Sequence, residues 1–329
     1  MKNKLSYKFL TTVIILLLIT SCSTKKKSWV HRQYHNTTAK YNGYFNGKES
    51  LKEGVNKLKK NHKDDYTAIL PIFKTGDLNK SKITHIYMDK AIKKGSIVIQ
   101  RHSIKIKGKE YCKWIDDNYF LVGQAYFYKG EFDEAIKTFA FIKEEYKRQP
   151  IKHKASLWLL RSYTEKEDFI AGELELSEME SNRKFPKELE KERSLFAAEY
   201  YLKQANYPLA LNQIEKTIKK TKRKKNKARL HYIAAQINKR LKNQIKAKKH
   251  FKEVLKTNPE YEMVFNTKMN LAQLLDLETK DGEKMRKNLI KMTKDDKNIE
   301  YLDQIYYTIG QMEMTQKDTL SAIDNYYLS

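Results

Sequence analysis

Apolar residues recur every three or four positions through most of the chain. From Asn46 onward this spacing predicts helices, because side chains three and four positions apart share one face of a helix. Two helices are expected first, one over residues 48–60 and a longer one that ends near His102. Their apolar faces carry Leu51, Val55 and Leu58, and then Ile83, Met88, Ile92 and Ile99. We interpret residues 46–115 as helical lead-in hairpins.

A longer repeating pattern begins at residue 116. Large, small and aromatic residues follow one another at Tyr119, Gly123 and Tyr126, and Ala135 and Phe139 continue the series before a proline. This order is typical of the tetratricopeptide repeat, in which small residues let the two helices of a hairpin approach closely. The small position of the second helix recurs at spacings of 37, 38 and 37 residues. It is occupied by Ala135, Gly172, Ala210 and Ala247.

A last copy is visible at Gly310 and Ala322, with room for one degenerate unit before it. We therefore expect five or six units over residues 116–329, which would stack into an all-α solenoid. The chain stops at Ser329, within the second helix of the last unit. Because apolar side chains there would face water, we expect this last unit to be truncated. These side chains are Ile323, Tyr326 and Tyr327.

The N-terminus has a different pattern. An eleven-residue apolar run from Phe9 to Ile19 follows three lysines and ends shortly before Cys22. A bilayer span needs roughly 20 apolar residues, whereas a charged start and a short apolar core before a cysteine are typical of a bacterial lipoprotein signal. We predict a signal peptide over residues 1–21, acylation of Cys22 and a lipid-proximal tether over residues 22–45. An ordinary secretory signal with an incidental cysteine is the alternative.

Composition adds a strong positive charge. The chain has 66 Lys and Arg against 40 Asp and Glu, a formal net charge of +26. Such a field attracts nucleic acid, anionic membranes and acidic partners alike. Export removes the chain from cytoplasmic nucleic acid, so anionic head groups are the expected electrostatic partner and nucleic acid is not. The densest basic run, residues 219–227, is interpreted as a solvated loop, with docking to anionic lipid or an acidic partner as the alternative.

The chain shows no arrangement typical of an active site. No Ser/His/Asp order, phosphate-binding glycine loop or paired carboxylates stand out, and the His31/His35 pair lies in a segment without a firm helical pattern. If Cys22 is acylated, Cys112 has no disulfide partner within the chain, and burial is its expected state. We therefore predict a non-enzymatic protein with no catalytic residues, no metal site, no cofactor and no small-molecule substrate.

Arrays of this repeat bind peptides along the inner face of their first helices. The pattern places a mixture of aromatic and polar side chains there, which suits a protein-binding groove. They are Phe120, Gln124, Phe127, Leu157, Arg161, Leu195, Glu199, Tyr232, Gln236 and Lys239. Packing between neighbouring repeats is the alternative role. The set lacks the asparagine of the clamp that captures C-terminal carboxylates in chaperone-binding relatives.

Two stretches carry a more specific resemblance. Residues 34–54, which read YHNTTAKYNGYFNGKESLKEG, and residues 88–119 are similar to the start of the SprE/PorW family of Bacteroidetes tetratricopeptide-repeat lipoproteins. The resemblance implies an outer-membrane lipoprotein of type IX protein secretion and, in gliding species, of gliding motility. Its partners would be envelope proteins of the secretion and motility machinery. Family members are considerably longer than this chain.

We therefore expect a cell-envelope scaffold that its N-terminal lipid anchors in the outer membrane, facing the periplasm, and that binds proteins through its repeats. The alternative function is a general envelope adaptor for outer-membrane protein assembly or cell-wall machinery. An enzyme whose catalytic domain lies beyond Ser329 is a third class, and the residues of this chain do not support it.

Overall fold

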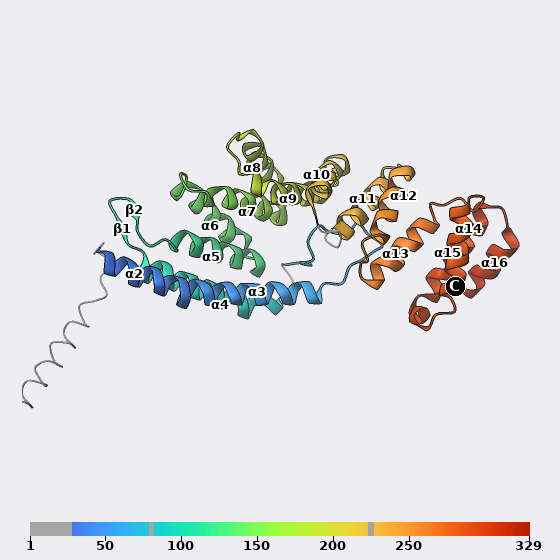
Figure 1. Cartoon of the computed structure of the whole chain (residues 1–329), viewed down its shortest axis with the longest axis horizontal. Helices are drawn as coiled ribbons and strands as arrows, with labels where there is room; N and C mark the ends of the chain where they lie inside the picture. The colour runs from blue at the N-terminus through green and yellow to red at the C-terminus, as the bar shows by residue number, and fades with distance from the viewer. Residues whose placement is uncertain (1–27, 79–81, 223–226) are drawn as a thin grey trace, which may run out of the picture. The chain divides into compact units, whose positions relative to one another are not determined.

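The computed structural model describes residues 28–78, 82–222 and 227–329, which are predominantly helical (Figure 1). The predicted signal peptide and Cys22 lie outside the described residues. The chain divides into two compact units. Unit 1 contains residues 1–63 and 73–196, and unit 2 contains residues 64–72 and 197–329.

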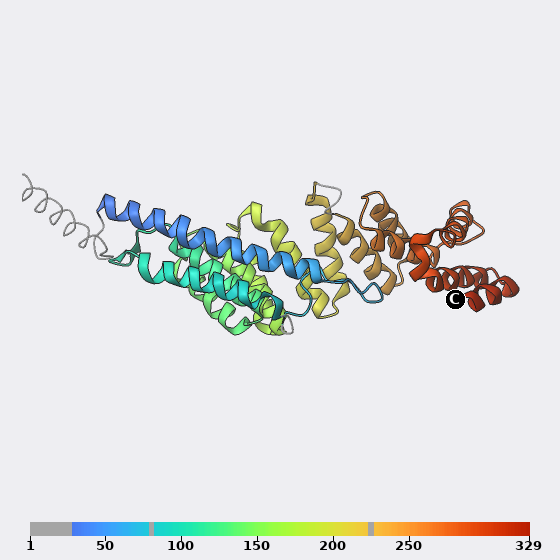
Figure 2. The same ribbon diagram turned by 90° about the horizontal axis from the view of Figure 1, so that it is seen from below.

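Unit 1 begins with three helical segments that follow one another without a break. The first elements are α2 (Trp29–Thr38), η1 (Ala39–Tyr44), α3 (Phe45–Asn61), η2 (Lys82–Thr84), α4 (His85–His102) and the antiparallel strands β1 (Lys105–Ile106) and β2 (Lys109–Glu110). Helices α3 and α4 lie side by side (Figures 1 and 2). The second lead-in helix thus ends at the residue that the apolar spacing predicted.

The expectation of a tether without helical structure over residues 22–45 is wrong from Trp29 onward, where the chain is helical. The reason is a row of small buried residues that includes Gly43 and Gly47. A Cβ atom added at Gly43 would overlap the side chain of Val98, so glycine permits the close approach to α4. Small residues bury a helix face without contributing to a hydrophobic pattern, which is why the pattern missed η1.

Six helical hairpins follow in chain order within the described residues. They are α5 (Ile115–Lys129) with α6 (Phe132–Glu145), α7 (Ile151–Lys166) with α8 (Phe169–Ser181), α9 (Glu190–Lys203) with α10 (Tyr207–Lys220), α11 (Ala228–Arg240) with α12 (Gln244–Leu255), α13 (Tyr261–Ala272) with α14 (Lys280–Met292), and α15 (Leu302–Thr315) with α16 (Thr319–Leu328). Short 3-10 segments, η3 (Lys187–Leu189) and η5 (Asp296–Tyr301), precede α9 and α15. The all-α repeat solenoid is confirmed.

The first hairpin shows why the repeat requires small residues. Gly123 of α5 faces the ring of Phe139 on α6, and an added Cβ atom would lie 2.7 Å from that ring. Gly130 ends α5 in the left-handed conformation, with φ of 85°, and the buried Phe132 begins α6. In four of the five later hairpins the second helix begins after an Asp or Asn whose side chain accepts a backbone N–H and so caps the helix, and in the fifth, α14, Thr279 has this role. The Asp and Asn residues are Asp168, Asn206, Asn243 and Asp318.

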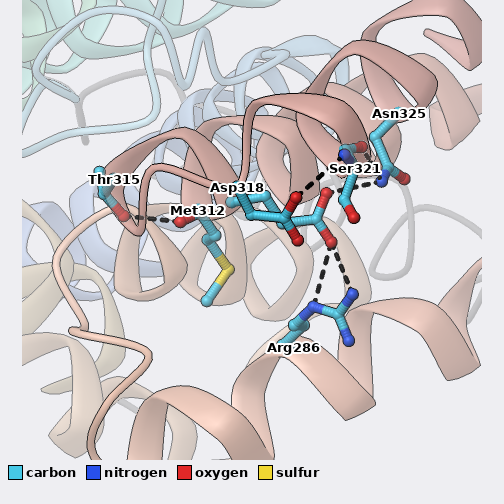
Figure 3. Close-up of polar contacts among 7 residues, drawn as sticks. Arg286, Met312, Thr315, Asp318, Ser321 and Asn325 are labelled. Atoms are coloured by element: carbon cyan, nitrogen blue, oxygen red, sulfur yellow. Dashed lines mark hydrogen bonds and ion pairs between the residues drawn. The ribbon is translucent and has the colours of Figure 1, made fainter.

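The last hairpin contains a buried carboxylate. Glu313 of α15 is 2% exposed and accepts hydrogen bonds from Nη2 of Arg286 at 2.6 Å and from Nδ2 of Asn325 at 2.8 Å (Figure 3). Asp318 accepts the backbone N–H of Ser321 at 3.2 Å and starts α16. These contacts join α14, α15 and α16.

Glu313→Gln should lower the free energy of unfolding by about 2 kcal/mol, because a neutral amide leaves the Arg286 guanidinium without its counter-ion. Urea unfolding followed by circular dichroism measures this change. The control is Glu283→Gln, which removes an exposed carboxylate that pairs with Lys287 within α14 and should leave stability nearly unchanged. Equal stabilities of the two variants would contradict the importance of the buried pair.

Candidate peptide-binding groove of unit 2

The inner face of unit 2 holds a segment of the same chain. Residues 64–72, here called the strap, form no helix or strand and belong to unit 2, although the residues on both sides belong to unit 1. The strap is the blue coil near α11 in Figure 1. The strap contacts α11 and the C-terminal half of α9. Three of the ten residues that the repeat pattern placed on the inner face take part, namely Glu199, Tyr232 and Gln236.

Arg229 of α11 holds both ends of the strap. Its Nη1 and Nη2 atoms donate to the two carboxylate oxygens of Asp64 at 2.7 and 2.8 Å, and its Nε donates to the carbonyl oxygen of Pro71 at 2.9 Å. The Asp64 side chain is 3% exposed and that of Arg229 is 14% exposed. A bidentate pair of this kind is strong and also fixes the orientation of the carboxylate.

Two of the predicted inner-face residues bind the main chain of the strap. Gln236 accepts the N–H of Leu70 at 3.0 Å and donates to the carbonyl oxygen of Ala68 at 2.7 Å. Glu199 accepts the N–H of Ile72 at 2.7 Å. Main-chain hydrogen bonds do not depend on the side chains of the bound segment, so this face can hold peptides of different sequence.

An aromatic contact completes the strap site. The Tyr66 ring packs edge-on against Tyr232, with 5.3 Å between the ring centroids. Tyr232 is fully buried, and its hydroxyl accepts a hydrogen bond from Nδ2 of Asn270 at 3.3 Å. Burial raises the pKa of both phenols, so both remain neutral in the physiological range.

A cavity of about 800 Å³ lies beside the strap. Strap residues 66–71 form one wall, and residues of α9, α10, α11 and α13, with Lys242 between α11 and α12, form the rest. Lys239, the last predicted inner-face residue, donates from Nζ to Oδ1 of Asn270 at 2.9 Å and to Oε1 of Gln273 at 2.8 Å. Desolvation lowers the pKa of Lys239.

In unit 1, three predicted partner-binding residues are packing residues instead. Phe127 and Leu157 are fully buried, and Arg161 is 5% exposed. The Arg161 guanidinium lies 4.4 to 5.4 Å from five ring centroids, and its Nη1 donates to the Tyr128 hydroxyl at 3.1 Å. The rings belong to Phe73, Phe127, Tyr128, Trp158 and Phe196. Spacing alone assigned these three residues to a surface. For Arg161, four of the five rings come from outside α7, so tertiary contacts bury it.

The other predicted residues of unit 1 remain accessible in part. Phe120 and Gln124 line a cavity of about 370 Å³ together with residues of α3, among them Lys48 and Lys52. Leu195 of α9 is half-buried. A partner contact at these three positions stays a prediction.

The strap itself was missed by the sequence reasoning, which left residues 61–82 as a connection between two helices. A signal was present in Tyr66-Thr-Ala-Ile-Leu-Pro-Ile-Phe73, because this run is too apolar for an ordinary solvated loop and too short for a helix before its proline. Its binding site could not be found locally. Asp64 and Arg229 are separated by 165 positions in the chain.

Other chemistry in the described residues is limited. Residues 28–78, 82–222 and 227–329 hold no group of three or more His, Cys, Asp or Glu arranged for a metal ion. Cys112 is buried, and desolvation raises the pKa of its thiol to about 11, so it stays protonated at neutral pH. None of the helices in these ranges combines the length and the apolar character that crossing a bilayer requires.

Comparison with known proteins agrees with the fold. The family model "Tetratricopeptide repeat" matches residues 116–140, in α5 and α6, and residues 228–261, which include α11 and α12. No curated protein matches the chain. All-helical repeat folds of this kind are typically non-catalytic and mediate protein–protein interactions. The chain therefore contains tetratricopeptide repeats in both units and has the architecture of a protein-interaction scaffold.

Proposed function

We propose that this protein is a non-enzymatic scaffold of the type IX secretion and gliding machinery, anchored in the outer membrane through a lipid on Cys22 and facing the periplasm. The signal-like residues before Cys22 and the resemblance of residues 34–54 and 88–119 to the SprE/PorW family support the envelope part of this proposal. The strap supports the scaffold part. It is a peptide segment that the inner face of unit 2 already holds through main-chain hydrogen bonds.

A general envelope adaptor for outer-membrane assembly or cell-wall machinery is the second candidate. The family match to residues 116–140 and 228–261 supports both candidates equally, because the match covers only tetratricopeptide repeats, which a secretion scaffold and a general adaptor would both use. The two candidates differ in the proteins whose export depends on the scaffold.

Deleting the gene should stop export of proteins that carry type IX C-terminal signals and should stop motility if the organism glides. A scaffold without catalytic groups acts by holding partners together, so its loss should uncouple the machinery while lipoprotein sorting stays normal. Secretome proteomics of the deletion strain measures this. Type IX cargo that still reaches the medium, together with a broad loss of outer-membrane barrels, would support the general adaptor instead.

Cys22→Ser should abolish acylation and release the protein from the membrane fraction, because no helix in residues 28–78, 82–222 and 227–329 is long and apolar enough to replace the lipid as an anchor. Metabolic labelling with a fatty acid, followed by fractionation, measures both effects. A wild-type protein that takes up no label would refute the lipid anchor.

A further inference from the structure

One position of the repeat carries related side chains through all of unit 2. It directly follows the small residue of each first helix, in the pairs Ala198-Glu199, Ala235-Gln236, Ala272-Gln273 and Gly310-Gln311. These pairs recur at spacings of 37, 37 and 38 residues. We call Glu199, Gln236, Gln273 and Gln311 the ladder residues.

The strap engages the first two ladder residues. Glu199 accepts one strap N–H, and Gln236 pairs with the N–H of Leu70 and the carbonyl of Ala68, two positions earlier. A side-chain amide has both a donor and an acceptor, so it can bind a main chain in this manner without regard to its sequence. The contacts of Gln236 therefore show how the other amides of the ladder can act.

The last two ladder residues lie beyond the strap. Gln273 and Gln311 line a cavity of about 590 Å³ whose described lining comes from α11, α12, α13, α15, α16 and their connections, without strap residues. Nε2 of Gln273 donates to Oε1 of Gln311 at 3.1 Å. Each amide can form further hydrogen bonds, because it offers two N–H donors and an oxygen with two lone pairs.

Positive charge is concentrated at the same place. Lys239 and Lys242 line both this cavity and the one beside the strap, so the two cavities meet at these lysines. The Lys239 ammonium bonds to amide oxygens of Asn270 and Gln273, and desolvation lowers its pKa. Among the described residues that line the two cavities, Glu199 is the one carboxylate, and it already accepts the N–H of Ile72. A partly desolvated cation with neutral partners favours an anionic ligand.

We propose that the open part of the groove, from Lys239 to Gln311, binds an extended acidic segment of a partner protein. Gln273 and Gln311 bond to its main chain as Gln236 bonds to the strap, and Lys239 and Lys242 pair with its carboxylates. The amides select a peptide over a lipid head group, because a peptide presents alternating N–H and C=O groups. This inference rests on the proposed scaffold function and specifies the chemistry of the partner.

The test is fluorescence anisotropy of the full-length, detergent-solubilised protein with a fluorescein-labelled peptide of alternating Asp and Leu. A peptide of alternating Asn and Leu is the neutral probe. The acidic probe should bind about tenfold tighter or more, and Lys239→Gln with Lys242→Gln should remove about tenfold of that affinity. The matched control is Lys246→Gln with Lys249→Gln, which removes the same charge from exposed positions of α12 and should change affinity less than about twofold at physiological salt.

Gln311→Glu provides a second variant that preserves side-chain size, and the carboxylate that it introduces should weaken binding of the acidic probe. Thermal melts establish that each variant is folded. Equal losses from both lysine pairs, or equal binding of the two probes, would overturn the proposal, because the peptide would then respond only to net charge. If the peptide responds only to net charge but the deletion strain loses type IX export, the proposed peptide site is refuted and the secretion function stands. If the acidic probe binds selectively but the deletion strain still exports type IX cargo, the secretion function is refuted and the peptide site stands.

Discussion

Arg229→Ala should release the strap from unit 2 and lower the free energy of unfolding by about 3 to 5 kcal/mol, which is the usual cost of breaking a buried ion pair. The substitution removes both hydrogen bonds to Asp64 and the bond to the carbonyl of Pro71. It also leaves the Asp64 carboxylate, 3% exposed, without this cation.

Limited proteolysis with chymotrypsin measures the release of the strap, because the bond after Tyr66 is a cleavage site that the bound strap protects. Cleavage there should become about tenfold faster or more, since proteases act on the opened state. Urea unfolding gives the change in stability. Arg240→Ala, on the same helix but exposed, is the matched control and should have little effect. Unchanged cleavage and stability in Arg229→Ala would contradict this account of the strap.

Arg161→Ala should destabilise unit 1 by about 3 to 5 kcal/mol, because it removes a buried side chain and its desolvated cation–π contacts together. The guanidinium has five rings around it and bonds to the Tyr128 hydroxyl. Phe73, the residue that follows the strap, is one of these rings.

Urea unfolding and near-ultraviolet circular dichroism of the Trp158 environment measure this effect. Arg161→Met separates the effect of lost volume from the effect of the lost cation, because methionine fills much of the same volume without a charge. Recovery of most of the stability in Arg161→Met would show that volume dominates, and no recovery would show that the cation does. An unfolding midpoint of Arg161→Ala equal to that of the wild type would refute a structural role for the cluster.

The strap also decides where a partner can bind in unit 2. It is joined to the chain at both ends, so its effective concentration at the groove is high, on the order of mM for a short connection. A free peptide of similar intrinsic affinity does not displace it. The positions of Glu199 and Gln236 therefore stay filled, and the positions of Gln273 and Gln311 are the ones that a partner can reach.

Local spacing was sufficient to predict the hairpins. Ala135, Gly172, Ala210 and Ala247 are buried where the period of 37 or 38 residues placed them, because helix packing repeats the same close approach in each unit. The same reasoning failed for η1, whose buried residues, Ala39 and Gly43, carry little hydrophobic signal. Close approach to α4 stabilises that helix, and a single-helix pattern contains no information on its neighbour.

Local pattern and tertiary contacts also account for different parts of the groove. The sequence alone determined the all-helical repeat and the register that brings Glu199, Tyr232 and Gln236 to the inner face. The tertiary structure alone decided that residues 64–72 fill part of this face and that four rings from outside α7 surround Arg161. Periodicity reports which side of a helix a residue occupies. What covers that side depends on contacts between residues more than a hundred positions apart, such as Asp64 and Arg229, and no local pattern encodes them.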